Sequence, residues 1–347
     1  MEIKKIQDAD VENKKVLVRA DFNVSIVDGK VQDDFKLRAC KETVEYLLSR
    51  QGTKIALASH FGRPDGKVTL EFSLKQIQNE LEKILGKKII FIPDCIGDIV
   101  QEAMQKQQAS EIILLENIRF YSEEEKNDPE FSKKLAENFD VFINDAFSVC
   151  HRDQASMTGV TKFLPSYAGF WLQKEIIEME KIKNNFERPA VAIIGGAKIE
   201  TKLPVIKLFE DKYDYVLVGG KIANEAIDQK IEFSERVILP FDFVDDRIDI
   251  GPKTLEKFKE IIKNSKTIVW NGPMGKFEEE KYAIGTDEIS KAILESDAYT
   301  VVGGGETIEV LEKNDAINQI SFVSTGGGAM LEYLSGNKMP GIEALER

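Results

Sequence analysis

AVAIIGGAK (190–198) and YDYVLVGG (213–220) are two of five short apolar runs that end in glycine in the second half of the chain. The others are KTIVWNGPMG (266–275), AYTVVGGGE (298–306) and ISFVSTGGGA (320–329). Amphipathic stretches such as TLEKFKEIIKN (254–264) lie between them. Short, continuously apolar strands that alternate with helices predict a parallel sheet covered by helices on both faces.

Apolar runs of the same kind occur in the first half of the chain, namely KKVLVRADFNV (14–24), KIALASH (54–60), EIILLENIRF (111–120) and DVFINDAF (140–147). Two such sets predict an α/β fold made of two doubly wound, parallel-sheet (Rossmann-like) domains. We expect the first domain over 1–168, a hinge helix over 169–189 and the second domain over 190–335. The charge-rich stretch 121–134 is interpreted as a solvated loop and the start of a helix.

Composition limits the possible partners. The 347 residues carry a net charge of −13, which argues against nucleic acid or an anionic membrane surface as a partner. The cysteines, Cys40, Cys95 and Cys150, are far apart in the sequence and are interpreted as buried thiols in a reducing compartment. The sequence shows neither a secretory signal nor an apolar run of membrane-spanning length, so we expect a cytoplasmic protein.

Basic side chains gather at the predicted strand ends of the first half. In open α/β sheets, ligands bind beyond the carboxyl ends of the strands. Both histidines of the chain lie in such loops, each close to an arginine. Guanidinium groups suit phosphate and carboxylate, whereas Asp21 and Asn23 suit hydroxyl groups. These strand ends therefore predict a site for a small, strongly anionic ligand, with the candidates Arg19, Asp21, Asn23, His60, Arg63, Arg119, Asn144, Asp145, His151 and Arg152.

Glycines take the place of basic residues at the strand ends of the second half. Glycine lets backbone N–H groups approach a phosphate, and a following helix N-terminus adds partial positive charge. Lys198 and Lys202 in GGAKIETK supply further charge, and Glu306 in GGGET is the candidate ligand of Mg²⁺. The sequence lacks a P-loop and a clean GxGxxG motif. The two halves together predict phosphoryl transfer between a nucleotide and a small polyanion.

Each of these features also has a purely structural interpretation. An arginine at a strand end is often a surface residue, and a glycine pair is often a turn. His60 is equally compatible with a structural histidine that has its hydrogen bonds satisfied. Glu306 is also favoured simply by its place in the first turn of a helix. Glu278, in a run that is otherwise interpreted as a solvated face, lies where it would reach a ribose.

The same residues carry a family resemblance. The chain resembles the phosphoglycerate kinases over nearly its whole length, through VLVRADFNV, SHFGRPDGK, LLENIRFY, NDAFSVCHR, IGGAKIETK, DIGPKT, VWNGPMGKFE, GGGET and STGGGAMLEYL. The resemblance implies two Rossmann-like domains joined by a hinge. It implies 3-phosphoglycerate or 1,3-bisphosphoglycerate on the first domain and Mg-ATP or Mg-ADP on the second, brought together by hinge closure. It also implies that the tail 336–347 folds back on the first domain and that the enzyme is a monomer.

The resemblance further implies a role for individual residues. The implied phosphoglycerate ligands are Asp21, Asn23, Lys36, His60, Arg63, Arg119 and Arg152. The implied nucleotide ligands are Gly196, Lys198, Lys202, Asn271, Glu278, Gly303, Gly304, Gly305 and Thr307. Among the implied catalytic groups, Lys202 accompanies the moving phosphoryl group, and the helix N-termini at Gly305 and Gly328 neutralise developing charge. Lys36 is the fourth implied catalytic residue.

Three features depart from the family pattern. Lys36 stands where the family has an arginine, so an ammonium group replaces a planar guanidinium group that can form bidentate hydrogen bonds. Arg38 is two positions further along and is an alternative donor. Glu306 is one methylene longer than the family's aspartate. The stretches 219–240 and 241–254 are abbreviated, and the first of them lines part of the adenine site in the family.

These departures leave two alternatives to an active phosphoglycerate kinase. One is a catalytically degenerate homologue that binds phosphoglycerate or nucleotide in a regulatory role. The other is a kinase that uses another nucleotide or another small phosphorylated acid. The nearly complete set of basic and glycine residues favours the kinase, which would reversibly transfer the γ-phosphoryl group of ATP to the carboxylate of 3-phosphoglycerate.

Overall fold

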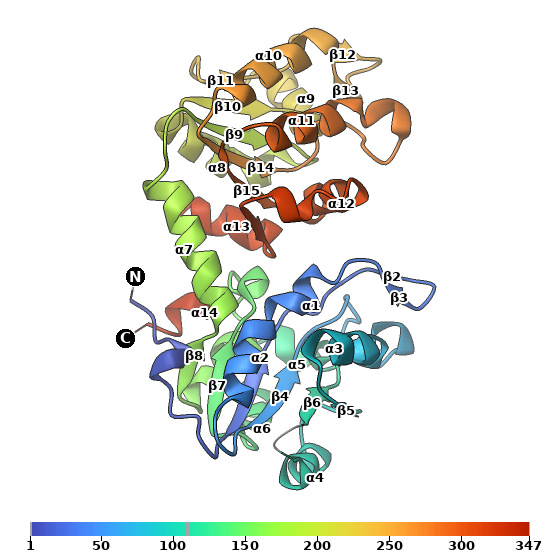
Figure 1. Cartoon of the computed structure of the whole chain (residues 1–347), viewed down its shortest axis with the longest axis vertical. Coiled ribbons are helices and arrows are strands. Elements are labelled where there is room, and N and C mark those ends of the chain that lie inside the picture. Colours follow the sequence, from blue (N-terminus) through green and yellow to red (C-terminus); the bar gives the residue numbers. More distant parts are fainter. Residues whose placement is uncertain (1, 109–110, 347) are drawn as a thin grey trace. The chain divides into compact units, whose positions relative to one another are not determined.

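The computed structural model describes residues 2–108 and 111–346, and the chain divides into two compact units. Unit 1 comprises Met1–Ile176 and Lys338–Arg347, and unit 2 comprises Ile177–Asn337. Each unit is a sheet with helices packed on it (Figure 1). Helix α7 (Phe170–Asn184) begins in unit 1 and ends in unit 2, so the boundary between the units falls inside the stretch expected to be the hinge.

The sheet of unit 1 has six parallel strands. Their spatial order is β5 (Ile89–Ile92), β6 (Ile112–Leu115), β4 (Lys54–Ala58), β1 (Lys15–Arg19), β7 (Val141–Asn144) and β8 (Ser166–Ala168). The edge strands β5 and β8 were absent from the sequence-based set. A two-stranded hairpin of β2 (Ile26–Val27) and β3 (Lys30–Val31) lies outside the sheet. The helices are α1 (Phe35–Ala39), α2 (Lys41–Leu48), α3 (Gln78–Leu85), α4 (Asp98–Lys106), α5 (Ser122–Glu125), α6 (Pro129–Ala136) and α14 (Pro340–Glu343).

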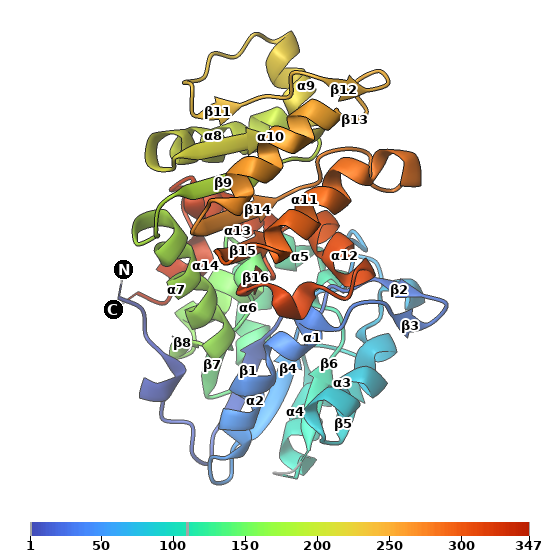
Figure 2. The same cartoon turned by 45° about the horizontal axis from the view of Figure 1, so that its top comes forward.

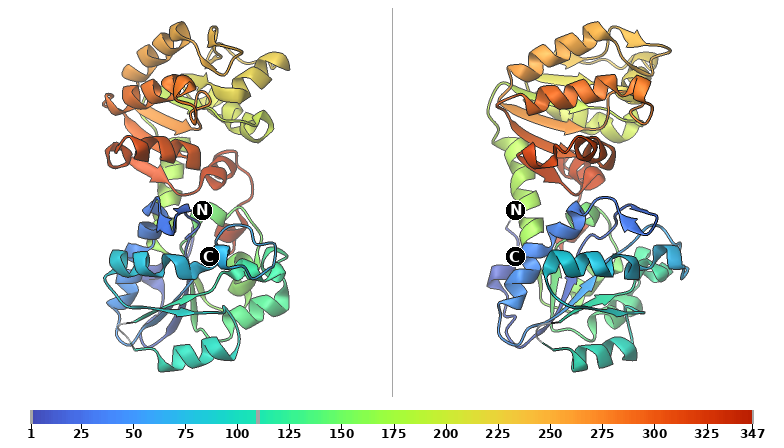
Figure 3. Two further views of the ribbon diagram at one scale, coloured as in Figure 1. Left: turned by 90° about the vertical axis from the view of Figure 1, so that its right-hand side faces the viewer. Right: turned by 45° about the vertical axis from the view of Figure 1, so that its right-hand side comes forward.

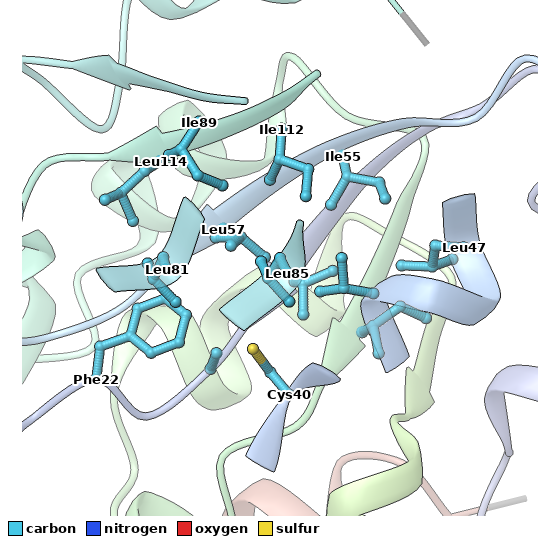
Figure 4. Packing of buried hydrophobic residues seen from close by; sticks show 14 of the residues in the cluster. Phe22, Cys40, Leu47, Ile55, Leu57, Leu81, Leu85, Ile89, Ile112 and Leu114 are labelled. Carbon is cyan, nitrogen blue, oxygen red and sulfur yellow. The ribbon is translucent and has the colours of Figure 1, made fainter. Parts of the chain in front are cut away.

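Strand side chains of unit 1 alternate between two hydrophobic clusters, one on each face of the sheet. On one face, Val16 and Val18 of β1 belong to a cluster that includes residues of α2 and α3. Figure 4 shows part of this cluster, with Leu47 of α2 and Leu81 of α3 labelled. On the other face, Leu17 packs with residues of α4 and α6. Because both faces are buried, the strands have the continuously apolar sequences from which they were predicted. All three cysteines are buried free thiols, as expected.

The sheet of unit 2 is also parallel and six-stranded (Figure 2). Its order is β11 (Val237–Ile238), β10 (Tyr215–Val218), β9 (Ala190–Ile194), β14 (Thr267–Asn271), β15 (Tyr299–Gly303) and β16 (Phe322–Ser324). Numbered along the chain within this sheet, the order is 3-2-1-4-5-6, which is the Rossmann order. The prediction of two doubly wound parallel sheets is therefore confirmed. The helices are α8 (Ile199–Lys212), α9 (Gly220–Asp228), α10 (Pro252–Lys263), α11 (Ile284–Leu294), α12 (Gly305–Lys313) and α13 (Gly327–Leu334).

Shorter elements complete the described chain. In unit 2 an antiparallel hairpin joins β12 (Phe243–Val244) to β13 (Asp249–Ile250). The amphipathic stretch 70–85 forms two 3₁₀ turns before α3, because Ser73 between them has extended backbone and its side chain accepts the N–H of Lys75. The turns are η1 (Ile6–Asp8), η2 (Leu70–Phe72), η3 (Leu74–Ile77), η4 (Ile118–Phe120), η5 (Phe147–Val149), η6 (Ala155–Gly159, a π-helix), η7 (Val160–Lys162), η8 (Glu280–Tyr282) and η9 (Ile317–Gln319).

The C-terminal segment belongs to unit 1. The N–H of Lys4 donates to the carbonyl of Leu345 at 2.9 Å, and the N–H of Gly341 donates to the carbonyl of Cys150 at 2.9 Å. Asn144, at the end of β7, donates from its side chain to the carbonyl of Gly341. Within the described residues, no helix combines the length and apolar character needed to cross a membrane.

Candidate functional site

The carboxyl end of the unit 1 sheet holds an acidic residue surrounded by donors. Asp21, just after β1, is buried. Its Oδ2 lies 2.9 Å from Nζ of Lys36 and accepts the Ser148 hydroxyl at 2.6 Å. Burial by itself would raise the pKa of Asp21, but the Lys36 ammonium, His60 and the Ser148 hydrogen bond hold the pKa well below its usual range. Asp21 is therefore an ionised acceptor at the point where the strand order reverses, between β1 and β7.

Two buried residues follow β4 and β6 at the same edge. His60 is 4% exposed, and Arg119 on η4 is 5% exposed. Nη1 of Arg119 donates to the carbonyl of Gly62 at 3.0 Å, but its Nε and Nη2 are buried without a hydrogen-bond partner. Burial and the charges of Arg19 and Arg152 lower the pKa of Arg119 to about 10. A buried, still cationic guanidinium with unused donors is the arrangement expected at an anion site.

The remaining candidates of unit 1 differ in exposure. Asn23 accepts the N–H of Gly62 at 2.9 Å and holds the loop after β4. Arg63 is exposed. Nη1 of Arg152 lies 4.0 Å from Glu125, which is also 3.5 Å from Nε of Arg119.

The structure settles two of the sequence-based interpretations in unit 1. Lys36 on α1 points to Asp21, whereas Arg38 is exposed and pairs with Asp34 on its own helix, so Arg38 does not replace the missing arginine. The stretch 121–134 is not only a solvated loop. Glu124 in it is fully buried and accepts both the N–H and the hydroxyl of Ser156, at 2.9 and 2.6 Å.

Unit 2 presents helix N-termini at the carboxyl end of its sheet. Helices α8, α9, α12 and α13 each follow a strand, and the residue preceding each one makes no side-chain capping hydrogen bond. A neighbouring carboxylate, Glu225, caps α8 through the N–H of Ile199. Gly304, before α12, has φ +103°, a conformation that glycine adopts at no steric cost. A Cβ on Gly305 or Gly328 would meet nothing within 4 Å, so the first turns of α12 and α13 are open.

Lys202 lies over the point where the strand order of unit 2 reverses. Its Nζ donates to the carbonyl of Gly195, after β9, at 2.5 Å, and to the carbonyl and side-chain oxygens of Asn271, on β14, at 3.1 and 2.8 Å. Burial lowers the pKa of Lys202 to about 8, against the opposing effect of the Glu306 carboxylate. Nδ2 of Asn271 is buried without a partner. Thr307 is fully buried, and its hydroxyl accepts the N–H of Gly272 at 2.7 Å.

A cavity of about 360 Å³ opens beside these residues. Of the predicted residues, Gly196, Glu278 and Glu306 line it. Lys198, Lys202, Asn271, Gly303, Gly304, Gly305 and Thr307 do not line it, and of these Lys198 and Gly305 are exposed.

Sequence reasoning missed five polar residues of this cavity. Its lining also includes Lys221, Asn224, Asp246, Arg247 and Lys276. Lys221 directly follows the strand-end glycine pair 219–220, and Lys198 follows the pair 195–196 after one alanine. The pattern that singled out Lys198 was therefore also present at Lys221. Arg247 lies in the β12–β13 hairpin loop within the abbreviated stretch and has φ +64°. No local sequence pattern marked this loop as part of a cavity wall.

Comparison with known proteins identifies the family of the chain. The phosphoglycerate kinase family model matches residues 6–235 and 242–337. The chain belongs to the phosphoglycerate kinase family. Phosphoglycerate kinase of Borrelia hermsii is 39% identical over 393 aligned positions that cover all of both chains, and that of Moorella thermoacetica is 39% identical over 98% of both.

Solved structures show the same relationship. The phosphoglycerate kinase of Pyrococcus horikoshii superposes with a TM-score of 0.87 at 32% identity, over 99% of this chain and 98% of that one. The enzyme of Coxiella burnetii gives 0.82 at 31% identity, over 99% of both. The alignment with the Borrelia hermsii enzyme has 393 positions against 347 residues in this chain, and the family match is interrupted at 236–241. Both observations agree with the shortening inferred from the sequence.

Proposed function

We propose that this chain catalyses reversible phosphoryl transfer between ATP and the carboxylate of 3-phosphoglycerate, giving ADP and 1,3-bisphosphoglycerate. The observation that carries the proposal is membership of the phosphoglycerate kinase family over almost the entire chain. The two strand-end sites support it, because each carries a set of donors suited to one of the two substrates. We place 3-phosphoglycerate on unit 1 and the nucleotide on unit 2.

The donors of unit 1 fit a small acid that carries a phosphate. Nη2 of Arg119 is buried without a partner, and Nε makes no hydrogen bond and only an ion pair with Glu125. Arg63, in the loop that begins at His60, is exposed. The ionised Asp21 would accept a hydrogen bond from a ligand hydroxyl, and this would select a hydroxy acid over an acid that lacks the hydroxyl. Lys36 stabilises Asp21 and carries the charge nearest to it.

The donors of unit 2 fit a polyphosphate. Open first turns of α12 and α13 offer backbone N–H groups and partial positive charge. Lys202 and the unpartnered amide of Asn271 add directed donors, and Glu278 on the cavity wall would bind the ribose.

Mg²⁺ fits Glu306 together with substrate oxygens. Glu306 lines the cavity, and among the described residues no cluster of three or more metal-binding side chains occurs. A single carboxylate that shares the ion with nucleotide phosphates is usual for Mg²⁺. When bound, the ion would neutralise charge on those phosphates.

The chain's own residues contribute positioning and charge neutralisation. The acceptor carboxylate attacks the γ-phosphorus in line, the bond between that phosphorus and the β,γ-bridging oxygen breaks, and ADP leaves with the bond's electron pair. Lys202 would leave its carbonyl partners to follow the transferred group. Backbone N–H groups of Gly305 and Gly328 and the Lys36 ammonium would stabilise the charge that develops on the phosphoryl oxygens. For this step the two ligands must meet, so we propose that transfer requires closure about α7.

The test is an assay of the purified chain with Mg-ATP and 3-phosphoglycerate, in which hydroxylamine traps the acyl phosphate. Hydroxamate that forms only with both substrates supports the proposal. Arg119→Ala should raise the KM for 3-phosphoglycerate at least about tenfold and leave the KM for ATP unchanged. The matched control is Arg38→Ala, which removes an exposed arginine and should change neither. Absence of hydroxamate, with 3-phosphoglycerate still raising the melting temperature, would refute catalysis and support a binding role.

The shortened wall of the cavity favours one further candidate, a kinase for another nucleotide. The β12–β13 loop places Asp246 and Arg247 on the cavity surface. Repeating the assay with each nucleoside triphosphate decides the preference, because the lowest KM identifies the base that this wall accepts. We further propose that the enzyme works as a monomer in the cytoplasm. Sedimentation of the purified chain as a species of twice its mass would contradict the monomer.

A further inference from the structure

Two buried arginines at the carboxyl end of the unit 1 sheet differ in how their donors are used. Nη2 of Arg119 has no partner, and its Nε has no hydrogen bond and only an ion pair with Glu125 at 3.5 Å. Arg19, at the end of β1, is 0% exposed, and each of its three guanidinium nitrogens contacts a protein acceptor. Nη1 donates to the carbonyl of Ala20 at 2.5 Å, Nε donates to the hydroxyl of Ser156 at 3.0 Å, and Nη2 lies 3.1 Å from Nδ1 of His60. Arg19 is therefore not arranged as a ligand of an anion.

The contact between Arg19 and His60 defines the proton position on the imidazole. A guanidinium group has donors and no acceptor, so Nδ1 of His60 must accept the hydrogen bond through its lone pair. A ring that accepts at Nδ1 is neutral and carries its proton on Nε2. Nε2 has no hydrogen-bond partner among the residues described by the structure. The Nε2–H group is left to donate to an oxygen of a bound ligand.

We propose that Arg19 is a positioning residue that holds His60 in the neutral Nε2–H tautomer, so that His60 binds the acid substrate as a hydrogen-bond donor and not as a cation. This inference rests on the proposed function, because it assigns to His60 a role in binding 3-phosphoglycerate. A neutral donor at this place is useful. Lys36 and Arg119 already act on His60 with positive charge, and a charged imidazole would be repelled by both.

Surrounding residues fix Arg19 in turn. Ser156 on η6 accepts from Nε of Arg19 and donates its hydroxyl proton to Glu124 on α5. The Glu124 carboxylate is buried and balances the buried guanidinium charge through the serine. A chain of contacts therefore runs from Glu124 on α5 through Ser156 on η6 and Arg19 on β1 to His60 in the loop after β4.

The charges that face His60 agree with a neutral ring. Burial, then Arg19 of β1, Arg119 of η4 and Lys36 of α1 lower the pKa of His60 well below its usual value, against the opposing effect of the Asp21 carboxylate. We therefore expect the ring to stay neutral over the whole working pH range.

The first experiment is ¹⁵N NMR of the imidazole nitrogens in the full-length protein without substrate. The chain has two histidines, so a His151→Gln variant assigns the spectrum. His60 should show one pyrrole-type nitrogen at Nε2 and one pyridine-type nitrogen at Nδ1, unchanged from pH 5 to pH 8. A proton on Nδ1, or a ring that titrates in this range, overturns the proposal whatever the catalytic activity is.

The second experiment separates positioning from a structural role. Arg19→Met removes the donor, so His60 should titrate or mix tautomers, and the KM for 3-phosphoglycerate should rise while the KM for ATP stays the same. The Met substitution should have no further effect in a His60→Gln background. An equal loss in both backgrounds means that Arg19 acts independently of His60 and refutes the proposal. If Arg19→Met does not fold, Arg19→Lys keeps a donor and should retain the tautomer, and the spectrum of the parent protein still decides.

Discussion

Lys202 should set an alkaline limit to catalysis. In the folded chain, burial lowers the pKa of this lysine from 10.5 to about 8, despite the Glu306 carboxylate nearby. At pH 7 about nine in ten molecules carry the proton on Nζ, and at pH 9 about one in ten do. Because the charged ammonium is needed to follow the transferred phosphoryl group, kcat/KM for Mg-ATP should fall roughly tenfold between pH 7 and pH 9.

Glu306→Gln tests the cause of this pKa. The Glu306 carboxylate raises the pKa of Lys202, so its neutral isostere should lower that pKa further and move the alkaline limb of the profile to lower pH, in addition to any loss of overall rate. Glu309→Gln is the matched control, because Glu309 is an exposed residue of the same helix that does not line the cavity.

The assay is steady-state kcat/KM for Mg-ATP at saturating 3-phosphoglycerate, from pH 6 to pH 9.5, with enzyme returned to pH 7 to verify reversibility. This ratio reports groups of the enzyme before the nucleotide binds. If kcat/KM for Mg-ATP did not fall up to pH 9.5, the proposed role of the charged lysine would be refuted. If the fall at alkaline pH occurred at the same pH in Glu306→Gln as in the parent, the carboxylate would not act on Lys202.

Two further predictions concern unit 1. Lys36→Arg should raise kcat about tenfold in the same assay. A guanidinium group can keep the contact with Asp21 and direct a second donor toward the phosphoryl group. An unchanged or lower kcat contradicts this. Asp145 is buried, and burial raises its pKa to about 7 although the carboxylate accepts the N–H of Leu172 at 3.0 Å. Since the folded-state pKa lies above the usual 3.8, the stabilising contribution of the protonated acid is present below about pH 4 and is lost as the pH rises through 7. Asp145→Asn keeps the acceptor oxygen and cannot ionise. At pH 8 its free energy of unfolding, measured by urea denaturation, should therefore exceed that of the parent by up to about 4 kcal/mol, and at pH 4 the two should be equal. Equal free energies of unfolding at pH 8 would contradict this.

The central strands of both sheets were predictable because the signal is local. Figure 3 shows helices packed on the sheet of each unit. Strands such as β1 and β9 are buried on both faces, so their apolar runs are continuous and end abruptly at residues of the candidate site. Three of the four edge strands, β5, β8 and β11, were missed. β11 has two residues and β8 has three, which gives composition little to act on. The edge strand β16 also has three residues, but it was predicted because its apolar run leads directly into three glycines.

The use made of each arginine was not predictable, because it depends on partners distant in the sequence. Arg19 and Arg119 look alike in the sequence, since each lies at the end of an apolar run. Ser156, which is 137 positions from Arg19, accepts a hydrogen bond from Arg19 and so helps to make it a positioning group. Arg119 has no such hydrogen-bonding partner for its Nε or Nη2. Glu124 shows the same limit, because its charge-rich neighbourhood indicated solvent and its burial became apparent only in the structure.

With the ligands placed as proposed, the two units would recognise anions by different means, and the difference follows from their strand ends. Unit 1 would use guanidinium and imidazole side chains, whose fixed planes distinguish a particular arrangement of carboxylate, hydroxyl and phosphate. Unit 2 would use glycine turns and open helix N-termini, which bind phosphate oxygens and make no contact with the rest of the ligand. Discrimination between nucleotides must then come from the cavity wall, which in this chain includes the shortened loop with Asp246 and Arg247. Changes in that loop should therefore alter the choice of nucleotide while leaving selection of the acid substrate to the buried groups of unit 1.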